Sequence, residues 1–279
     1  MQSMVDLLQP QTSREWLDGR IIDLKEADSA RSLYMAYTLC GQHFSEEVLL
    51  LSDAQTHPLF RLHSPSQREV ARLGLLSAAL EERPDFYSPK VLKLIQVADT
   101  GELITFLKYL VVLPSHEDFV LAAVEALRTN IADVFVAISL ENPYPKAFFN
   151  EQQWNQMYLK AAFMQLDLTR IDGVEARSNR ELARIISDYA HERWAASREI
   201  DPCIWRPVAD QLDEVLLKDM KHLFASQWKA ERLAAYIIAK ASAHPELAGE
   251  IQKNQDLDSD VQAEQPWIRV RDLWTEKVK

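Results

Sequence analysis

The sequence predicts an all-α protein, and three observations support this prediction. Only 6 of the 279 residues are glycine, whereas tight turns and hairpins depend on glycine. Apolar residues recur at steps of three and four from about residue 26 to residue 243, as in helices buried on one face. The connections between these segments are short, so neighbouring helices should pack antiparallel. We expect helix hairpins stacked as an irregular HEAT-like solenoid, or a compact helical globule.

The helix expected over residues 67–83 has clear boundary signals. Ser66 stands at the N-cap position, and Pro84 should end the helix. Pro89 then fits the first turn of the following helix, where a missing N–H group is tolerated. These signals predict two consecutive helices joined by a short turn.

Two further helices are expected over residues 116–130, behind Ser115 as a possible N-cap, and over residues 131–140. A loop with prolines at positions 143 and 145 follows them. Each proline disfavours the helical region for the residue before it, so Asn142 and Tyr144 should both be non-helical. The chain should therefore change direction here before the next helix.

The helix that begins near Trp154 is apolar around most of its circumference, yet Asn155 falls inside the apolar arc. A buried amide needs hydrogen-bond partners. Asn155 is expected to bond either the backbone of the preceding proline loop or a ligand in a pocket. Lys160, near the narrow polar strip, is either solvated or placed to bind an anionic ligand.

The helix expected over residues 179–198, with Ser178 or Asn179 as its cap, carries Arg193 on its apolar face. A guanidinium there needs a carboxylate, backbone carbonyls or a ligand. On the opposite face Arg184, Asp188 and His191 are spaced by four and three residues, so adjacent members can touch. Either this stripe is a solvated face, or Asp188 orients His191 as in a general base.

Composition and motifs exclude several classes of function. The formal net charge of −11 argues against binding to nucleic acid and to anionic membranes. The chain contains no glycine-rich nucleotide-binding motif. His191 and Glu192 begin a zincin-like run, but Ala195 stands where a second histidine is required. We therefore expect no metal site and no cofactor.

The sequence also predicts a cytoplasmic protein. Cys40 and Cys203 lie far apart and form neither a disulfide framework nor a zinc motif, which favours a reducing compartment. The first ten residues lack the features of a secretory signal. The longest stretch without charged residues, 32–45, is shorter than the roughly 20 residues that a bilayer requires. Direct membrane insertion is therefore not expected.

We expect one all-α domain over residues 1–250, followed by a distinct segment over residues 251–279. That segment begins with an acidic run, predicted to be a linker, and ends with a short stretch containing Trp267 and Trp274. The stretch is expected either to dock on the body as a helix or to bind a partner.

Three motifs stand in order in the middle of the chain: Asn142-Pro143-Tyr144-Pro145; Trp154-Asn155-Gln156-Met157 with Leu159-Lys160-Ala161; and Asp188-Tyr189-Ala190-His191-Glu192-Arg193 with Ala195-Ala196. In this order and spacing they resemble the EboA-domain family of bacterial proteins. The resemblance implies a cytoplasmic helical component of a system that moves secondary-metabolite precursors, including aromatic pigment intermediates, towards the cell envelope.

The resemblance brings no catalytic residues with it. It implies only a set of candidate ligand-binding positions: Asn142, Tyr144, Trp154, Asn155, Lys160, Asp188, His191, Glu192 and Arg193.

The leading hypothesis is a non-enzymatic binding or adaptor protein. Its ligand would be a small aromatic or isoprenoid metabolite, and its partners would be proteins of the same gene cluster. Tyr144, Trp154 and Tyr189 would supply rings for stacking. Two alternatives remain open. One is an enzyme that transfers a proton through Asp188 and His191, and the other is a scaffold that binds proteins and no ligand.

Overall fold

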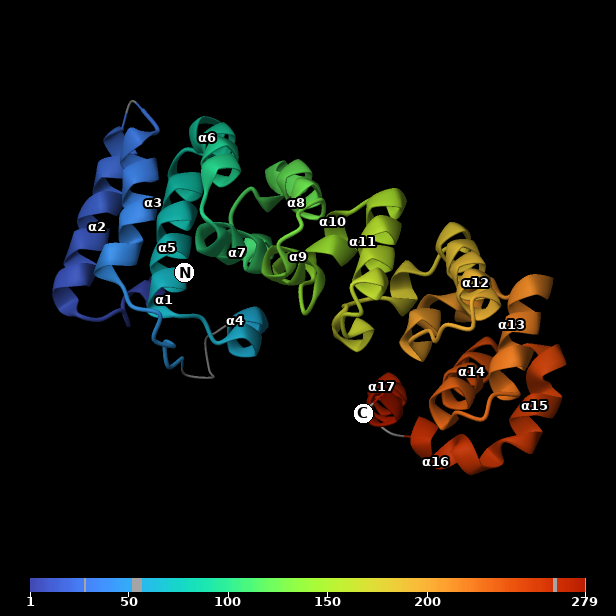
Figure 1. Ribbon diagram of the computed structural model, residues 1–279. Helices are drawn as coiled ribbons and strands as arrows, with labels where there is room; N and C mark the ends of the chain where they lie inside the picture. Colours follow the sequence, from blue (N-terminus) through green and yellow to red (C-terminus); the bar gives the residue numbers. More distant parts are fainter. Residues whose placement is uncertain (28, 52–56, 263–264, 279) are drawn as a thin grey trace. The chain divides into compact units, whose positions relative to one another are not determined.

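The computed structural model of the protein describes residues 1–27, 29–51, 57–262 and 265–278. Over these residues the regular structure is helical, and an isolated antiparallel bridge between Val48 and Ser66 is the one β-type pairing (Figure 1). The all-α prediction is therefore confirmed. None of the described helices combines the length and the apolar character that crossing a lipid bilayer requires.

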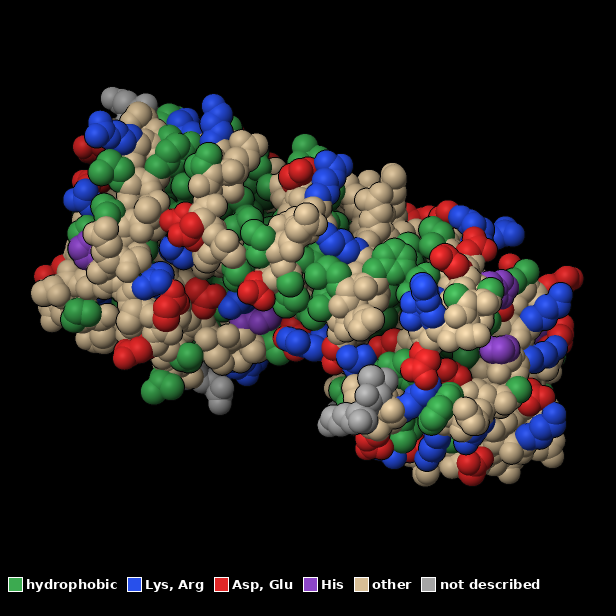
Figure 2. Space-filling model, viewed as in Figure 1, with side chains coloured by type: hydrophobic (Ala, Val, Ile, Leu, Met, Phe, Trp, Pro, Cys, Tyr) green, Lys and Arg blue, Asp and Glu red, His purple; other side chains and the backbone are tan. Residues whose placement is uncertain are grey.

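The chain divides into two compact units, Met1–Phe148 and Phe149–Lys279. The division falls inside the stretch 1–250 for which the sequence predicts one domain. On the face shown in Figure 2, acidic and basic side chains are interspersed over the surface. Each unit has its own buried core and is described below by itself.

The N-terminal unit is built around α5, which packs on α1, α2, α3, α6 and α7, while α9 packs on α7, α8 and α10. Ten buried residues on α5 make it the centre of this core. The helices are α1 (Gln2–Val5), α2 (Gln11–Glu26), α3 (Arg31–His43), α4 (Pro58–His63), α5 (Gln67–Glu82), α6 (Pro84–Val97), α7 (Thr100–Lys108), α8 (Val120–Ala126), α9 (Ala132–Ser139) and α10 (Tyr144–Phe148), with the 3₁₀ turns η1 (Leu110–Val112) and η2 (His116–Phe119).

The predicted start of α5 is confirmed. The Ser66 hydroxyl accepts a hydrogen bond from the Glu69 N–H at 3.2 Å, and the Glu69 carboxylate accepts one from the Ser66 N–H at 2.8 Å. Two of the donors that a helix start leaves unpaired are thereby satisfied. The prediction for Pro89 was wrong, because α6 begins at Pro84 and holds Pro89 in its interior. Pro84 itself takes the first position, where proline is tolerated.

The segment after Ser115 also differs from the prediction. Ser115 makes no capping hydrogen bond and has a φ of 53°, in the left-handed region. The chain therefore starts as the 3₁₀ turn η2, and α8 follows from Val120 to Ala126 rather than extending to residue 130. Tyr144 was expected outside any helix, yet it begins α10. A proline in the first turn of a helix is tolerated, so Pro145 does not prevent this start.

The C-terminal unit is organised around α14 and the 3₁₀ segment η5, which pack on each other and on α17; α13 packs on α14, and α12 on η5. Trp205 on η5 is completely buried. The elements are α11 (Glu151–Phe163), η3 (Leu168–Arg170), η4 (Glu175–Arg177), α12 (Arg180–Ala195), η5 (Pro202–Gln211), α13 (Glu214–Phe224), α14 (Lys229–Ser242), η6 (Pro245–Leu247), α15 (Ala248–Lys253), η7 (Gln255–Leu257), α16 (Asp258–Val261) and α17 (Pro266–Val278).

The end of the chain is folded against this unit. The acidic run is not an extended connection: it forms η7 and α16, Leu257 is completely buried, and the Tyr236 hydroxyl donates to Asp258 at 2.8 Å. The stretch with Trp267 and Trp274 forms α17, which packs on α14 and η5. Of the two options for this stretch, docking as a helix is the one observed. Residues 263–264 and 279 of the segment lie outside the described residues.

A histidine in the N-terminal unit should make stability depend on pH. His63 Nε2 lies 3.1 Å from the Glu141 carbonyl oxygen. Burial lowers the pKa of His63 below the ordinary value of 6.5, and the charge of Lys108 acts in the same direction. The unfolded chain therefore binds the proton more tightly, and stability should fall as the pH drops below about 6.5 towards the folded pKa.

Thermal unfolding between pH 7.5 and pH 5 measures this effect. The loss of stability on acidification should be smaller in His63→Gln, which keeps a donor for the Glu141 carbonyl but does not titrate. His222→Gln, which replaces an exposed histidine of the other unit, serves as the control. An identical pH dependence in the native protein and His63→Gln would contradict the prediction.

Candidate functional site

The Asn142 side chain bonds three backbone groups of the N-terminal unit. Its side chain is 2% exposed. The amide donates to the carbonyl oxygens of Leu107 at 2.9 Å and Ala137 at 2.8 Å, and its oxygen accepts from the Tyr144 N–H at 3.0 Å. All three contacts are to the backbone, so the side chain joins the ends of α7 and α9 to the start of α10.

Tyr144 is likewise part of the packed core. Its ring is completely buried, and its hydroxyl donates to the His116 carbonyl oxygen at 2.7 Å. Burial raises the pKa of the phenol well above its ordinary value. The ring lies 4.7 Å from the ring of Phe148, centre to centre. These contacts hold Tyr144 in the packed core, and its role as a stacking surface for a ligand stays a prediction.

Trp154 and Asn155 anchor the start of α11 inside the C-terminal unit. Trp154 is completely buried, with the Arg177 guanidinium 5.1 Å from its ring centre. Asn155 and Asn179 exchange amide hydrogen bonds of 3.1 Å and 2.9 Å, and Asn179 also caps α12 by accepting from the Leu182 N–H at 2.9 Å. Of the two caps expected for α12, Ser178 and Asn179, the structure shows Asn179.

The proline loop expected as one possible partner of Asn155 was wrong, because the partner is the side chain of Asn179, the N-cap of α12. A contact between Asn155 and a ligand stays a prediction. The burial that the sequence indicated is correct, since Asn155 is 5% exposed. Lys160 lies half-buried on α11. Its role in binding an anion stays a prediction.

The pairing expected on α12 is only half correct. Arg184 and Asp188 form an ion pair at 2.5 Å, as their spacing predicts. The alternative in which Asp188 orients His191 is not observed, because His191 Nε2 lies 2.6 Å from an oxygen of Asp219 on α13. The Ser187 hydroxyl donates to the other Asp219 oxygen at 2.6 Å. Asp219 is 2% exposed. A buried carboxylate needs hydrogen-bond donors, and His191 and Ser187 supply them.

Arg193 bonds a backbone carbonyl, which is one of the partners expected for it. Its Nε and Nη2 donate to the Glu199 carbonyl oxygen at 3.0 Å and 2.5 Å. The chain turns back after α12 through Ser197, whose φ is 53°. Arg193 therefore ties the turn to the helix. Glu192, its neighbour, is exposed.

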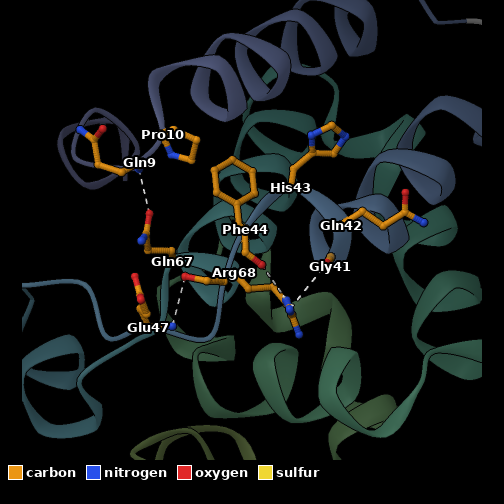
Figure 3. Close-up of a pocket in the computed structure, with 10 residues that line it drawn as sticks. Gln9, Pro10, Gly41, Gln42, His43, Phe44, Glu47, Gln67 and Arg68 are labelled. Atoms are coloured by element: carbon orange, nitrogen blue, oxygen red, sulfur yellow. Dashed lines mark hydrogen bonds between the residues drawn. The ribbon is translucent and has the colours of Figure 1, made fainter.

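A hollow of about 640 Å³ opens on the N-terminal unit between residues of α3, α5 and the segment before α2 (Figure 3). Arg68 donates to the carbonyl oxygens of Phe44 at 3.1 Å and Gly41 at 3.2 Å, and Gln67 accepts from the Gln9 N–H at 2.8 Å. Gln67 and Arg68 thus tie α5 to the segment before α2 and to the end of α3. We assign no ligand to this hollow.

A second pocket, of about 320 Å³, lies within the C-terminal unit. Residues of α11, α12, η5 and α17 and of the turns beside them surround it. The ring centres of Phe163 and Tyr189 are 5.0 Å apart at one side. The lining residues are Ala162, Phe163, Gln165, Tyr189, Arg193, Glu199, Ile200, Asp201, Ile204, Arg271, Trp274 and Thr275.

Charged groups pair across this pocket. Arg271 bonds the carboxylate of Asp201. Burial raises the pKa of Asp201, while its hydrogen bond from the Cys203 N–H and the nearby Arg271 oppose that shift. The Glu199 carboxylate lies 2.8 Å from the Lys277 ammonium. Both acidic groups of the lining are therefore matched by cations of α17.

The structure brings few of the predicted residues together at this pocket. Arg193 and Tyr189 line it, as do Phe163, Arg271 and Trp274, which were not predicted as site residues. The spacing of Arg271 and Trp274 by three on one amphipathic helix is the signal that would have indicated a shared face. In the described part of the chain, no cluster of three or more His, Cys, Asp or Glu residues could hold a metal ion.

Comparison with known proteins gave one result. A family model described as "Metabolite traffic protein EboA" matches residues 1–209. No curated protein and no solved structure matched the chain. The match ends before α17, so the helix that supplies Arg271 and Trp274 lies outside it.

Proposed function

The chain belongs to the EboA family, and from this premise we propose that it is a non-enzymatic helical binding protein of metabolite traffic. Its ligand is a small metabolite, held in the pocket lined by Arg193 and Tyr189. The observation that carries the proposal is this pocket, because aromatic rings and a few placed polar groups around about 320 Å³ are the usual form of a small-molecule site.

The wider setting is part of the same proposal. The protein acts in the cytoplasm, alongside proteins of the same gene cluster, and passes secondary-metabolite precursors towards the cell envelope. The two unpaired cysteines, Cys40 and Cys203, support a reducing compartment. We also propose that helix hairpins stack in the manner of an irregular HEAT-like solenoid, which would offer surfaces to protein partners.

An enzymatic role is the second candidate, and one contact favours it. A buried carboxylate that accepts from one nitrogen of a histidine orients the ring and leaves the other nitrogen as a base. The Asp219–His191 contact at 2.6 Å has this form, with Asp219 in the place predicted for Asp188. His191 does not line the pocket, however, so binding without turnover is the better-supported proposal.

Thermal unfolding of the purified full chain in the presence of aromatic acids, indoles, phenols and prenyl phosphates tests the proposal. A ligand at a hundredfold excess over its dissociation constant adds about 2.7 kcal/mol of stability, which shifts the midpoint by a few degrees. The shift should disappear in Ala162→Trp, which fills the pocket, and persist in Ala225→Trp, on an exposed site of the same unit.

A panel without any shift would contradict the proposal and favour a scaffold that binds only proteins. A shift that survives Ala162→Trp would place the ligand elsewhere. Each compound that binds is then incubated with the native protein and analysed for products, because turnover of a bound compound would establish the enzymatic role instead.

A further inference from the structure

The pocket of the C-terminal unit has aromatic side chains from three separate helices in its lining. Phe163 comes from α11, Tyr189 from α12 and Trp274 from α17. Phe163 is 56% exposed, although an aromatic ring of this size is usually buried. Rings from three helices in the lining of a small cavity favour a flat aromatic guest, which gains contact area and ring–ring attraction at once.

The charges around the pocket are balanced except for one. Arg271 is paired with Asp201, and Glu199 is paired with Lys277 at 2.8 Å. Arg193 bonds only a neutral carbonyl oxygen, through Nε and Nη2, and its Nη1 makes no hydrogen bond within the described part of the chain. One guanidinium therefore lines the pocket without an acidic partner.

An unmatched guanidinium beside apolar rings is best satisfied by one negative group. A carboxylate on the ligand would accept a hydrogen bond from Nη1 of Arg193, and a charge-assisted bond of this kind is stronger than a neutral one. A diphosphate would bring more negative charge than Arg193 neutralises and would lie near the carboxylates of Glu199 and Asp201. The volume of about 320 Å³ lies at the small end of ligand sites, which suits one or two rings.

We infer that this pocket selects a planar aromatic monoanion, whose rings contact Phe163, Tyr189 and Trp274 and whose carboxylate pairs with Arg193. The inference rests on the proposed function, because it names the class of metabolite that the same site binds. It separates aromatic from isoprenoid ligands, both of which the leading hypothesis from the sequence allows.

Isothermal titration of the full chain with 2-naphthoate, with its neutral amide 2-naphthamide and with farnesyl diphosphate tests the inference. The native protein should bind the acid at least about tenfold more tightly than the amide, since the charged group adds a charge-assisted hydrogen bond. Farnesyl diphosphate should bind more weakly than the acid. This comparison uses native protein, so it holds whether or not any variant folds.

Variants of Arg193 test whether its guanidinium causes the preference for the acid over the amide. Arg193→Met should abolish the preference for the acid, and Arg193→Lys should retain part of it. Arg198→Met, at an exposed position five residues further along, is the matched control and should bind as the native protein does.

Equal affinity for acid and amide, or tighter binding of the diphosphate, would overturn the inference while leaving a small-molecule function in place. Failure of these three probes, when other compounds of the thermal panel bind, would also overturn the inference alone. If no compound of the thermal panel and none of the three probes binds, the proposed function is overturned together with the inference.

Discussion

Replacing Asn142 with leucine should lower the free energy of unfolding by about 3–5 kcal/mol, because the change removes the hydrogen bonds between the Asn142 side chain and three buried backbone groups. The groups are the carbonyl oxygens of Leu107 and Ala137 and the N–H of Tyr144, all of which bond the Asn142 amide. Leucine has as many side-chain heavy atoms as asparagine and the same branching, so the substitution leaves no cavity and the effect reports mainly the lost hydrogen bonds. Urea unfolding followed by circular dichroism measures it.

Asn130→Leu is the control for this experiment. Asn130 is exposed in the same unit, and the substitution there should change stability by less than about 0.5 kcal/mol. If Asn142→Leu were as stable as the control, the bonds of Asn142 would contribute nothing to the fold. A functional role for this family position would then become the better explanation of its presence in the motif.

Replacing Trp154 with alanine should destabilise the protein by about 3–5 kcal/mol, the usual effect of removing a large, completely buried aromatic side chain. Trp154 has no exposed surface, and the Arg177 guanidinium over its ring would lose that contact as well. The position matches the EboA motif, yet the ring is not among the residues that line the ligand pocket. Ligand affinity, measured per folded molecule at low temperature, should therefore be unchanged.

Trp228→Ala provides the comparison, because that ring is 39% exposed and should lose less stability. Thermal and urea unfolding of both variants give the difference. A Trp154→Ala protein that kept its stability but lost ligand binding would show that the motif tryptophan contacts ligand, and would move the candidate site to α11.

The local pattern of the chain was enough to predict the helical class and several boundaries. Ser66 caps α5 and Asn179 caps α12, because a capping side chain bonds backbone groups only two or three residues away. The Arg184–Asp188 pair follows from a spacing of four on one helix. The burial of Asn155 follows from its place in an apolar arc. Pro89 was mispredicted because Pro84 competes for the same helix start.

The partners of the polar residues could not be predicted in the same way. Asn155 bonds Asn179, His191 bonds Asp219, and Arg271 bonds Asp201 across 70 residues of sequence. Each pair joins separate elements, and many other groups along the chain have compatible chemistry. The folded arrangement selects the pairs, because it buries particular carboxylates and amides and they must bond whichever donors lie within reach.

The class of fold and several of the helix boundaries are thus determined by short stretches of sequence, since they depend on contacts within one turn or one helix face. The pocket is not. Its walls come from residues 162 to 275, and its unpaired guanidinium is recognised only when Asp201 and Glu199 are seen to take other cations as partners. A binding site of this kind is a property of the packing, because proximity and burial, which periodicity does not encode, decide which charges remain without a partner.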